Sequence, residues 1–270
     1  FQCVQTVGCT GCTGNAGVCG KQAHTAKLQD ELTGALISLA KAADSTETIS
    51  KRTGQIIIEG LFTTVTNVSF DNAAIENMIQ KVRAEKERLV PDCRTEEYDL
   101  QQLWNANEDI RSLKSLILFG IRGMAAYAYH ANVLNYEDAE VNQFFCEALS
   151  KIGYEESTEA LLSTVLKTGE INLKCMALLD KANTETYGTP EPTDVTLTVE
   201  KGPFIVVTGH DLKDLQLLLE QTEGKGINIY THGEMLPAHA YPFLKKYSHL
   251  KGNFGTAWQN QQKEFDHLPA

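Results

Sequence analysis

A chain of 270 residues with 42% hydrophobic and 22% charged residues has the composition of a soluble globular protein and is long enough for two ordinary domains. No apolar run approaches the roughly 20 residues that a membrane-spanning helix needs, so a transmembrane protein is not expected. The net charge of −11, without a basic cluster that carries interleaved aromatic residues, argues against a nucleic-acid partner.

The first segment of the chain is rich in cysteine and glycine. Cys3, Cys9, Cys12 and Cys19 lie close together among glycines, and no charged residue occurs before Lys21. Four thiolates at this density can hold one zinc ion or one iron–sulfur cluster. Glycine lets the backbone curl around a ligand and direct N–H groups at sulfur, and the lack of carboxylates avoids adding charge to an anionic cluster. The segment therefore favours an iron–sulfur site over a zinc site.

The other three cysteines, Cys93, Cys146 and Cys175, occur singly in sequence that has a helical pattern. We expect them to be buried small apolar residues. A secreted framework of disulfides would spread its cysteines over the whole chain, and no secretory signal is visible. The protein is therefore expected to be cytoplasmic.

Apolar residues recur at the spacing of amphipathic helices through the first two thirds of the chain. Asp71 is a predicted N-cap, and Pro91 is predicted to end the helix that follows it. The face of the first helix consists of Leu28, Leu32, Leu36 and Leu39. Further helices are predicted over Lys51–Val68, Glu108–Leu134, Tyr136–Ile152 and Ser157–Asp180, the last broken at Gly169. The pattern indicates a helical bundle.

The character of the sequence changes at TYGTPEPTDV, residues Thr186–Val195, where a glycine and two prolines favour a linker. Beyond it, PFIVVTG predicts a strand, DLKDLQLLLEQ an amphipathic helix and GINIYTHG a second strand. This β-α-β order predicts a parallel sheet, in which ligands bind at the carboxyl ends of the strands. Two loops, TGHDL and THGEML, follow those ends.

The predicted fold class is a mainly α N-terminal helical bundle domain, followed by the start of an α/β Rossmann-like domain with a parallel sheet. The cysteine loop and the bundle are expected to cover residues 1–187, a linker residues 188–200, and the first part of the α/β domain residues 201–270. No internal repeat indicates a solenoid.

Five segments along the chain are distinctive in their residues and in their order. They are FQCVQTVGCTGCTGNAGVCGK with LQDEL after it, NEDIRSLKSLILFGIRGMAAYAYHA (Asn107–Ala131), YGTPEPTDV, TGHDLKDLQLLLEQTEGKGINIYTHGEMLPAHAYP (Thr208–Pro242) and GNFGTAW (Gly252–Trp258). In this order they resemble segments of the hybrid cluster protein family, also called prismane proteins or hydroxylamine reductases, which are relatives of carbon monoxide dehydrogenase. Together they cover essentially the whole chain.

The resemblance implies a simple iron–sulfur cluster held by four N-terminal cysteines, the first two of which are two residues apart in the family. Cys3, Cys12 and Cys19 match the second, third and fourth of these cysteines. The first would lie before Phe1, so we expect residues to be missing there, and the additional Cys9 could take its place. The spacing leaves open whether the cluster is [4Fe–4S] or [2Fe–2S].

The resemblance also implies a hybrid [4Fe–2O–2S] cluster, which the family binds through one histidine, two glutamates and four cysteines. His210 in TGHDL matches the histidine, and Glu234 in THGEML matches the first glutamate. Imidazole and carboxylate suit iron that carries oxo bridges. The other ligands would lie beyond Ala270, so we expect this chain alone neither to assemble the cluster nor to reduce hydroxylamine.

Five further side chains are interpreted as structural. His232 and His239 are expected to support the ligands or to lie on the surface. His130 is expected to be an interior histidine with a hydrogen-bond partner. Trp104 and Trp258 are interpreted as packing anchors.

The family implies an oxidoreductase that reduces a small nitrogen oxide species. The substrate is either hydroxylamine, which is reduced to ammonia, or nitric oxide. Electrons are expected from a redox partner protein, because no nicotinamide or flavin fingerprint is present. The alternative is a metal-stabilised interaction module that senses nitric oxide or passes nitrosyl groups to the thiols of other proteins. Iron and labile sulfide in excess of one four-iron cluster would favour the enzyme, whereas zinc alone would exclude it.

Overall fold

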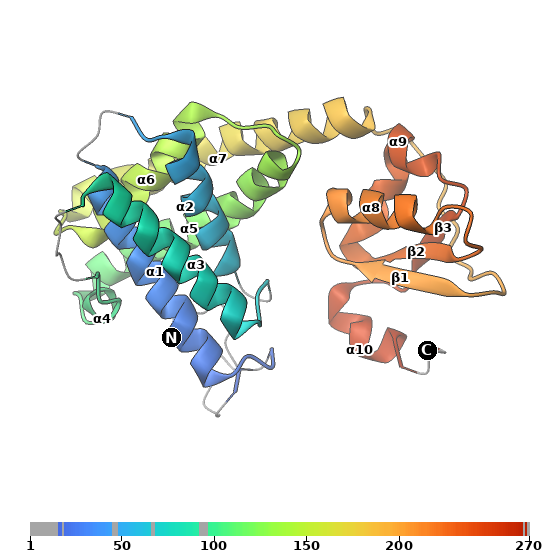
Figure 1. Cartoon of the computed structure of the whole chain (residues 1–270), viewed down its shortest axis with the longest axis horizontal. Coiled ribbons are helices and arrows are strands. Elements are labelled where there is room, and N and C mark those ends of the chain that lie inside the picture. Colours follow the sequence, from blue (N-terminus) through green and yellow to red (C-terminus); the bar gives the residue numbers. More distant parts are fainter. Residues whose placement is uncertain are drawn as a thin grey trace. The chain divides into compact units, whose positions relative to one another are not determined.

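A computed structural model describes residues 16–17, 19–44, 48–65, 68–91, 97–266 and 268, and the chain divides into two units, Phe1–Leu179 and Asp180–Ala270. Figure 1 shows helices in the first unit and a small sheet with helices in the second. This arrangement confirms the predicted fold class, a helical N-terminal part followed by an α/β unit with a parallel sheet. Among the described residues, no helix combines the length and the apolar character that crossing a membrane requires.

The helical unit is built around α1. It contains α1 (Ala23–Ala43), α2 (Lys51–Thr63), α3 (Asn72–Leu89), α4 (Gln101–Trp104), α5 (Glu108–Val133), α6 (Ala139–Gly153) and the first part of α7 (Thr158–Tyr187). α1 packs against α3 and α6, and α2 packs against α5. The predicted face of α1 is buried, and Leu32, Leu36 and Leu39 are wholly inaccessible. At Gly60 of α2 a Cβ atom would lie 2.7 Å from Leu36 Cδ2, so a glycine is needed for this close approach.

The predicted helix ends are correct for α3 and wrong for α2. The Asp71 side chain accepts a hydrogen bond from the Ala73 N–H at 2.9 Å, and α3 ends at Leu89, before Pro91. α2 ends at Thr63 and not at Val68. The N–H groups of Thr64 and Val65 bond the carbonyls three residues back, of Leu61 and Phe62, at 3.0 Å, which tightens the last turn and closes the helix.

Two other predicted helices also have different bounds. α6 begins at Ala139 and not at Tyr136, since Asp138 is the N-cap and accepts from the Val141 N–H at 3.0 Å. α7 runs unbroken through Gly169, although a glycine costs a helix interior about 1 kcal/mol. Burial of Ile171 and Cys175 in the following turns outweighs that cost.

The single cysteines that the structure describes are buried, as predicted. Cys146 and Cys175 are almost inaccessible, and their Sγ atoms contact the carbonyls of Ala40 and Met124 at 3.6 Å and 3.5 Å. Burial raises the pKa of each thiol to about 12. Both are therefore protonated and unreactive at neutral pH. Cys93 lies outside the described residues.

The two tryptophans differ in environment. Trp104 packs against the core of the helical unit, as predicted. Trp258 is 56% exposed, so the prediction that it anchors packing is wrong. His130 is half-buried, and its ring meets the rings of Phe62 and Tyr129 edge-on.

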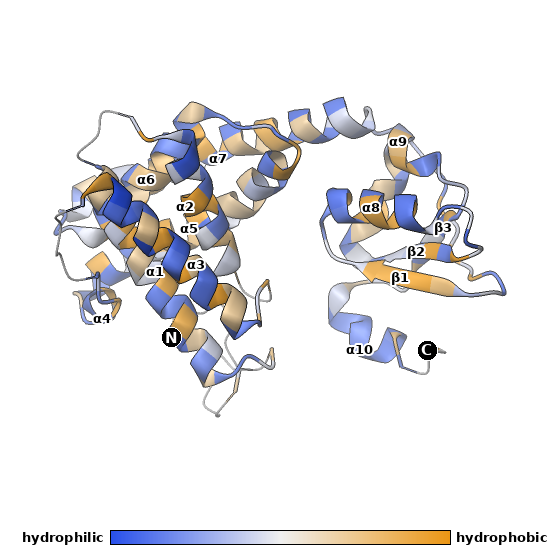
Figure 2. Ribbon diagram, viewed as in Figure 1, coloured by the Kyte–Doolittle hydropathy of each residue, from blue (hydrophilic) through white to orange (hydrophobic). Residues whose placement is uncertain are grey.

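The α/β unit contains three parallel strands in the order β1-β2-β3. Its elements are β1 (Phe204–Thr208), α8 (Leu212–Thr222), β2 (Asn228–His232), the 3₁₀ helix η1 (Gly233–Ala240), α9 (Pro242–Lys245), β3 (Leu250–Phe254), the 3₁₀ helix η2 (Trp258–Asn260) and α10 (Gln261–Glu264). The predicted strands and the helix between them are present, and α8 buries Leu215 and Leu219. In Figure 2, β1 is hydrophobic along its length whereas α10 is largely hydrophilic.

The third strand was not predicted from the sequence. Gly252 of β3 forms a parallel bridge with Thr196, and the Asn253 N–H donates to the Thr196 carbonyl at 2.9 Å. Thr196 lies in the predicted linker 188–200, so part of that segment pairs with the sheet. α7 ends at Tyr187, next to the predicted start of the linker, and the domain bounds themselves stay predictions.

Candidate metal centre

His210 and Glu234 follow the ends of two neighbouring parallel strands. Thr208 at the end of β1 pairs with His232 at the end of β2, so the two strands stop at the same level of the sheet. Gly209 with φ +137° and Gly233 with φ +56° come next, and both adopt backbone conformations that favour glycine. Each candidate ligand is thus placed two residues beyond its strand, after a glycine that turns the chain.

The two side chains meet. His210 Nε2 is in hydrogen-bond contact with Glu234 Oε2, although the residues lie 24 positions apart in the chain. The imidazole is 67% exposed and the carboxylate 57% exposed, so a metal in solvent can reach both. One nitrogen donor and one oxygen donor that already converge on each other form part of a ligand set for an intermediate metal such as iron.

This pair does not make a complete metal site by itself. Among the described residues, no group of three or more His, Cys, Asp or Glu side chains is placed to hold a metal ion. His210 and Glu234 alone can offer two donor atoms, and other donors would be needed to complete a metal site.

Cys19 is the one described member of the N-terminal cysteine set. It sits in a turn closed by the Gly17 N–H, which donates to the Lys21 carbonyl at 2.7 Å, and by an antiparallel bridge between Ala16 and Gln22. Its thiol is free and half-buried. This position is compatible with metal ligation. Cys3, Cys9 and Cys12 lie outside the described residues.

The two histidines expected from the sequence to support the ligands or to lie on the surface, His232 and His239, are both buried, so neither lies on the surface. His239 Nε2 is 2.9 Å from the Thr231 hydroxyl, which donates to Asn253 Oδ1 at 3.0 Å, and burial lowers the pKa of His239. His232 contacts Thr208 and Glu264. The contact with Glu264 was not foreseen, since no motif or regular spacing links residues 32 positions apart.

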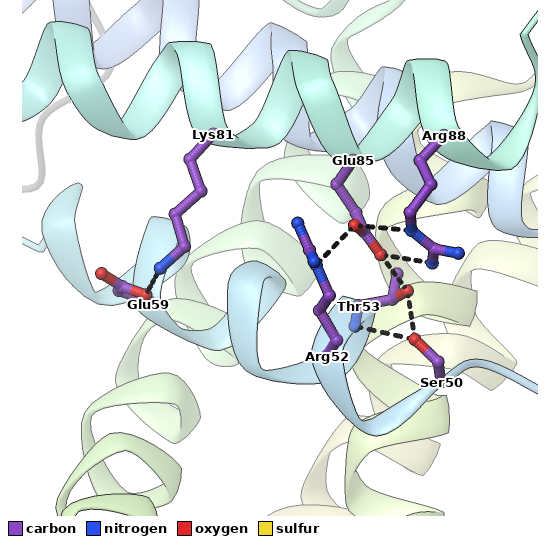
Figure 3. A network of polar contacts seen from close by, with 7 residues as sticks. All are labelled: Ser50, Arg52, Thr53, Glu59, Lys81, Glu85 and Arg88. Carbon is purple, nitrogen blue, oxygen red and sulfur yellow. Dashed lines mark hydrogen bonds and ion pairs between the residues drawn. The ribbon is translucent and has the colours of Figure 1, made fainter.

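A second polar cluster lies in the helical unit and contains a carboxylate, Glu85, whose role is structural (Figure 3). Glu85 of α3 is wholly buried and accepts from the Thr53 hydroxyl at 2.7 Å and from Arg88 at 2.7 Å and 3.0 Å. Arg52 Nε lies 3.0 Å from the same carboxylate, and the Ser50 hydroxyl caps α2 by accepting from the Thr53 N–H. These contacts, the hydrogen bonds from Arg88 first, lower the pKa of Glu85 to about 2. Its oxygens are saturated, which leaves no open position for a metal.

Comparison with known proteins points to one family. The Prismane/CO dehydrogenase family matches residues 1–270. A protein named hydroxylamine reductase from Thermodesulfovibrio yellowstonii is 47% identical over 299 residues, which cover 99% of this chain and 55% of that protein. Proteins of the same name from Solidesulfovibrio magneticus and Methanocella arvoryzae are each 44% identical, over 100% of this chain and 55% of their own length. The chain thus spans about half the length of the curated relatives it matches.

Proposed function

Because this chain belongs to the Prismane/CO dehydrogenase family, we propose that the protein containing it is a hydroxylamine reductase of the hybrid cluster type. Its substrate is a small nitrogen oxide species, either hydroxylamine, which it reduces to ammonia, or nitric oxide. The electrons come from a redox partner protein in the cytoplasm. The observation that supports the proposal is the contact between His210 and Glu234, two residues that follow different strands and whose side chains converge at one edge of the sheet.

The proposed ligand sets are those drawn from the motifs. Cys3, Cys12 and Cys19, with Cys9 or a further cysteine, hold a [4Fe–4S] or [2Fe–2S] cluster. His210 and Glu234 contribute two ligands to a [4Fe–2O–2S] cluster. Such a cluster, when bound, supplies redox-active iron at which an N–O bond can be reduced.

In this proposal His210 and Glu234 supply two donor atoms in fixed positions. His210 offers Nε2 to a metal only in the tautomer whose proton is on Nδ1, and a metal bound there would replace the contact of Nε2 with Glu234. Glu234 supplies a hard oxygen donor and negative charge that favours a cation. Both side chains follow rigid strands, which limits how far the two donor atoms can separate.

The alternative, a module that senses nitric oxide or transfers nitrosyl groups, requires accessible and ionisable thiols. Cys146 and Cys175 are buried and have pKa values raised to about 12, so neither is suited to transfer. Of the cysteines that the structure describes, only Cys19 is accessible enough for such chemistry. The contact between His210 and Glu234, which a thiol-based module does not need, favours the reductase.

The test uses the product of the whole gene, prepared anaerobically. We expect the protein to contain more iron and labile sulfide than one four-iron cluster holds. We also expect it to oxidise a reductant only when hydroxylamine is present. His210→Ala should abolish the paramagnetic signal of the hybrid centre and leave that of the N-terminal cluster. His24→Ala, at an exposed histidine of α1, is the control and should change neither signal. Zinc alone, or survival of both signals in His210→Ala, would contradict the proposal.

A further inference from the structure

His232 is a wholly buried histidine at the end of β2, two residues before Glu234. Its Nδ1 lies 3.2 Å from the hydroxyl of Thr208 at the end of β1, two residues before His210. Its Nε2 lies 2.8 Å from Glu264 Oε2 on α10. The imidazole therefore links the two strands that carry the candidate ligands to a helix that follows the third strand (Figure 1).

Glu264 is held in turn by the segment after β3. The Thr256 hydroxyl donates to Glu264 Oε1 at 2.6 Å, and Asn260 Nδ2 donates to the Thr256 hydroxyl at 2.9 Å. The donation from Thr256, followed by the contact with His232, lowers the pKa of Glu264, so this carboxylate is ionised at neutral pH. An ionised carboxylate only accepts hydrogen bonds, so Nε2 of His232 carries the proton.

The surroundings leave this contact little freedom. At Gly255, with φ +67°, a Cβ atom would lie 2.6 Å from Glu264 Oε2 and 2.8 Å from His232 Cδ2. The ring of Phe265 meets the His232 ring edge-on with centroids 4.9 Å apart. The imidazole is thus fixed by two polar contacts, one aromatic ring and a glycine backbone.

Stability alone does not account for this arrangement. A buried polar pair is seldom more stabilising than apolar residues of the same volume. An aliphatic side chain at position 232 could fill the same space between the strands, but it could not fix the ends of β1 and β2 through directed bonds. The pair is better explained by orientation than by packing.

We propose that His232, oriented by Glu264, is a positioning residue that holds the ends of β1 and β2 so that His210 and Glu234 face each other. The inference rests on the proposed function, in which these two side chains are metal ligands. His232 touches neither the metal nor the substrate in this scheme; it acts through the backbone of the two strand ends. Outer partners that orient ligands typically change metal affinity by about 10- to 100-fold when they are removed.

The experiment uses the whole 270-residue chain and has two readouts. The first needs no metal and is the nuclear Overhauser contact between the His210 ring and the Glu234 side chain. The second is the affinity for Co²⁺ alone, read from the paramagnetic shift of the His210 ring resonances, so that Co²⁺ bound by the N-terminal cysteines does not enter the measurement. We expect His232→Gln to abolish the contact and to weaken Co²⁺ binding by about tenfold or more. Thr256→Val, which removes only the hydroxyl that orients Glu264, should produce a smaller loss of both and serves as the milder variant should His232→Gln fail to fold.

His239→Gln is the matched control, because His239 is also buried in this unit and bonds a threonine hydroxyl of β2. It should leave the contact and the affinity unchanged within about twofold. Persistence of the His210–Glu234 contact in folded His232→Gln, or an equal loss in His239→Gln, would overturn the inference. If the unmodified chain binds no Co²⁺ while His232→Gln still loses the contact, the positioning role stands and the assignment of the two residues as ligands fails.

Discussion

Glu85 in the helical unit and Glu234 in the α/β unit are both carboxylates within polar clusters, but they differ in exposure and in the number of their partners. Glu85 is wholly buried and is bonded by Thr53 and Arg88, with Arg52 alongside. Glu234 is 57% exposed and contacts His210. Ionised groups that are buried and fully bonded hold a fold together, whereas exposed donors that converge with open positions can bind a metal. The number of bonds still available to the oxygens, and not the presence of a charge, separates the two roles.

Beside Glu85 the helical unit has a large apolar core, to which we assign most of its stability, so the largest effect should come from that core. Leu36→Ala removes a wholly buried side chain of α1 and should lower the free energy of unfolding by about 3–5 kcal/mol, through lost burial and the cavity that is left. Leu166→Ala on α7, where the side chain is 71% exposed, should change it by less than about 0.5 kcal/mol. Urea unfolding followed by circular dichroism measures both, and similar losses in the two variants would refute the assignment.

The buried carboxylate should give the next largest effect, and one that depends on pH. The pKa of Glu85 is about 2 in the folded protein and 4.5 as its ordinary value, so the ionised form favours folding. Its contribution is complete above about pH 4.5 and is lost as the pH falls from there toward about pH 2. The difference of the two pKa values corresponds to a contribution on the order of 3 kcal/mol near neutral pH.

Glu85→Gln removes this charge and tests that contribution. The variant should be less stable than the unmodified chain near pH 7. The gap between them should narrow as the pH falls from about 4.5 toward about 2, because the carboxylate of the unfolded chain is then protonated while that of the folded chain stays ionised. Urea titrations of both chains over this range measure the gap. A gap that is independent of pH would mean that the loss comes from altered packing and not from ionisation.

The same contrast explains what the sequence could predict. Periodic burial of Leu28, Leu32 and Leu36 and the cap at Asp71 are local properties, and they were read correctly from residue spacing. The β-α-β order was also sufficient to place His210 and Glu234 in neighbouring strand-end loops, and the parallel register of β1 and β2 brings those loops to the same edge of the sheet. The resemblance to the prismane family was confirmed by comparison over the whole chain.

What the sequence could not predict depends on contacts between distant residues. The strand LKGNF has only two apolar side chains, too few for a clear pattern. Its pairing with Thr196 relies on Gly252, where a Cβ atom would lie only 2.1 Å from the Thr196 carbonyl oxygen. The bond between His232 and Glu264 joins elements whose proximity is decided by the sheet. The break predicted at Gly169 failed because helix propensity is weaker than the burial of the neighbouring turns.

The smallest change in stability should come from the carboxylate of the candidate metal centre, in a substitution that matches Glu85→Gln atom for atom. Glu234→Gln alters an exposed contact with His210, and exposed ion pairs contribute about 0–1 kcal/mol, so the free energy of unfolding should change by less than about 0.5 kcal/mol. The amide is a weaker and uncharged donor, so the affinity for Co²⁺ read at the His210 ring resonances, apart from Co²⁺ bound by the cysteines, should nevertheless fall by about tenfold. Urea unfolding and Co²⁺ titration of the same sample separate the two effects. A loss of stability as large as that of Glu85→Gln, with metal affinity unchanged, would reverse the roles assigned to the two carboxylates.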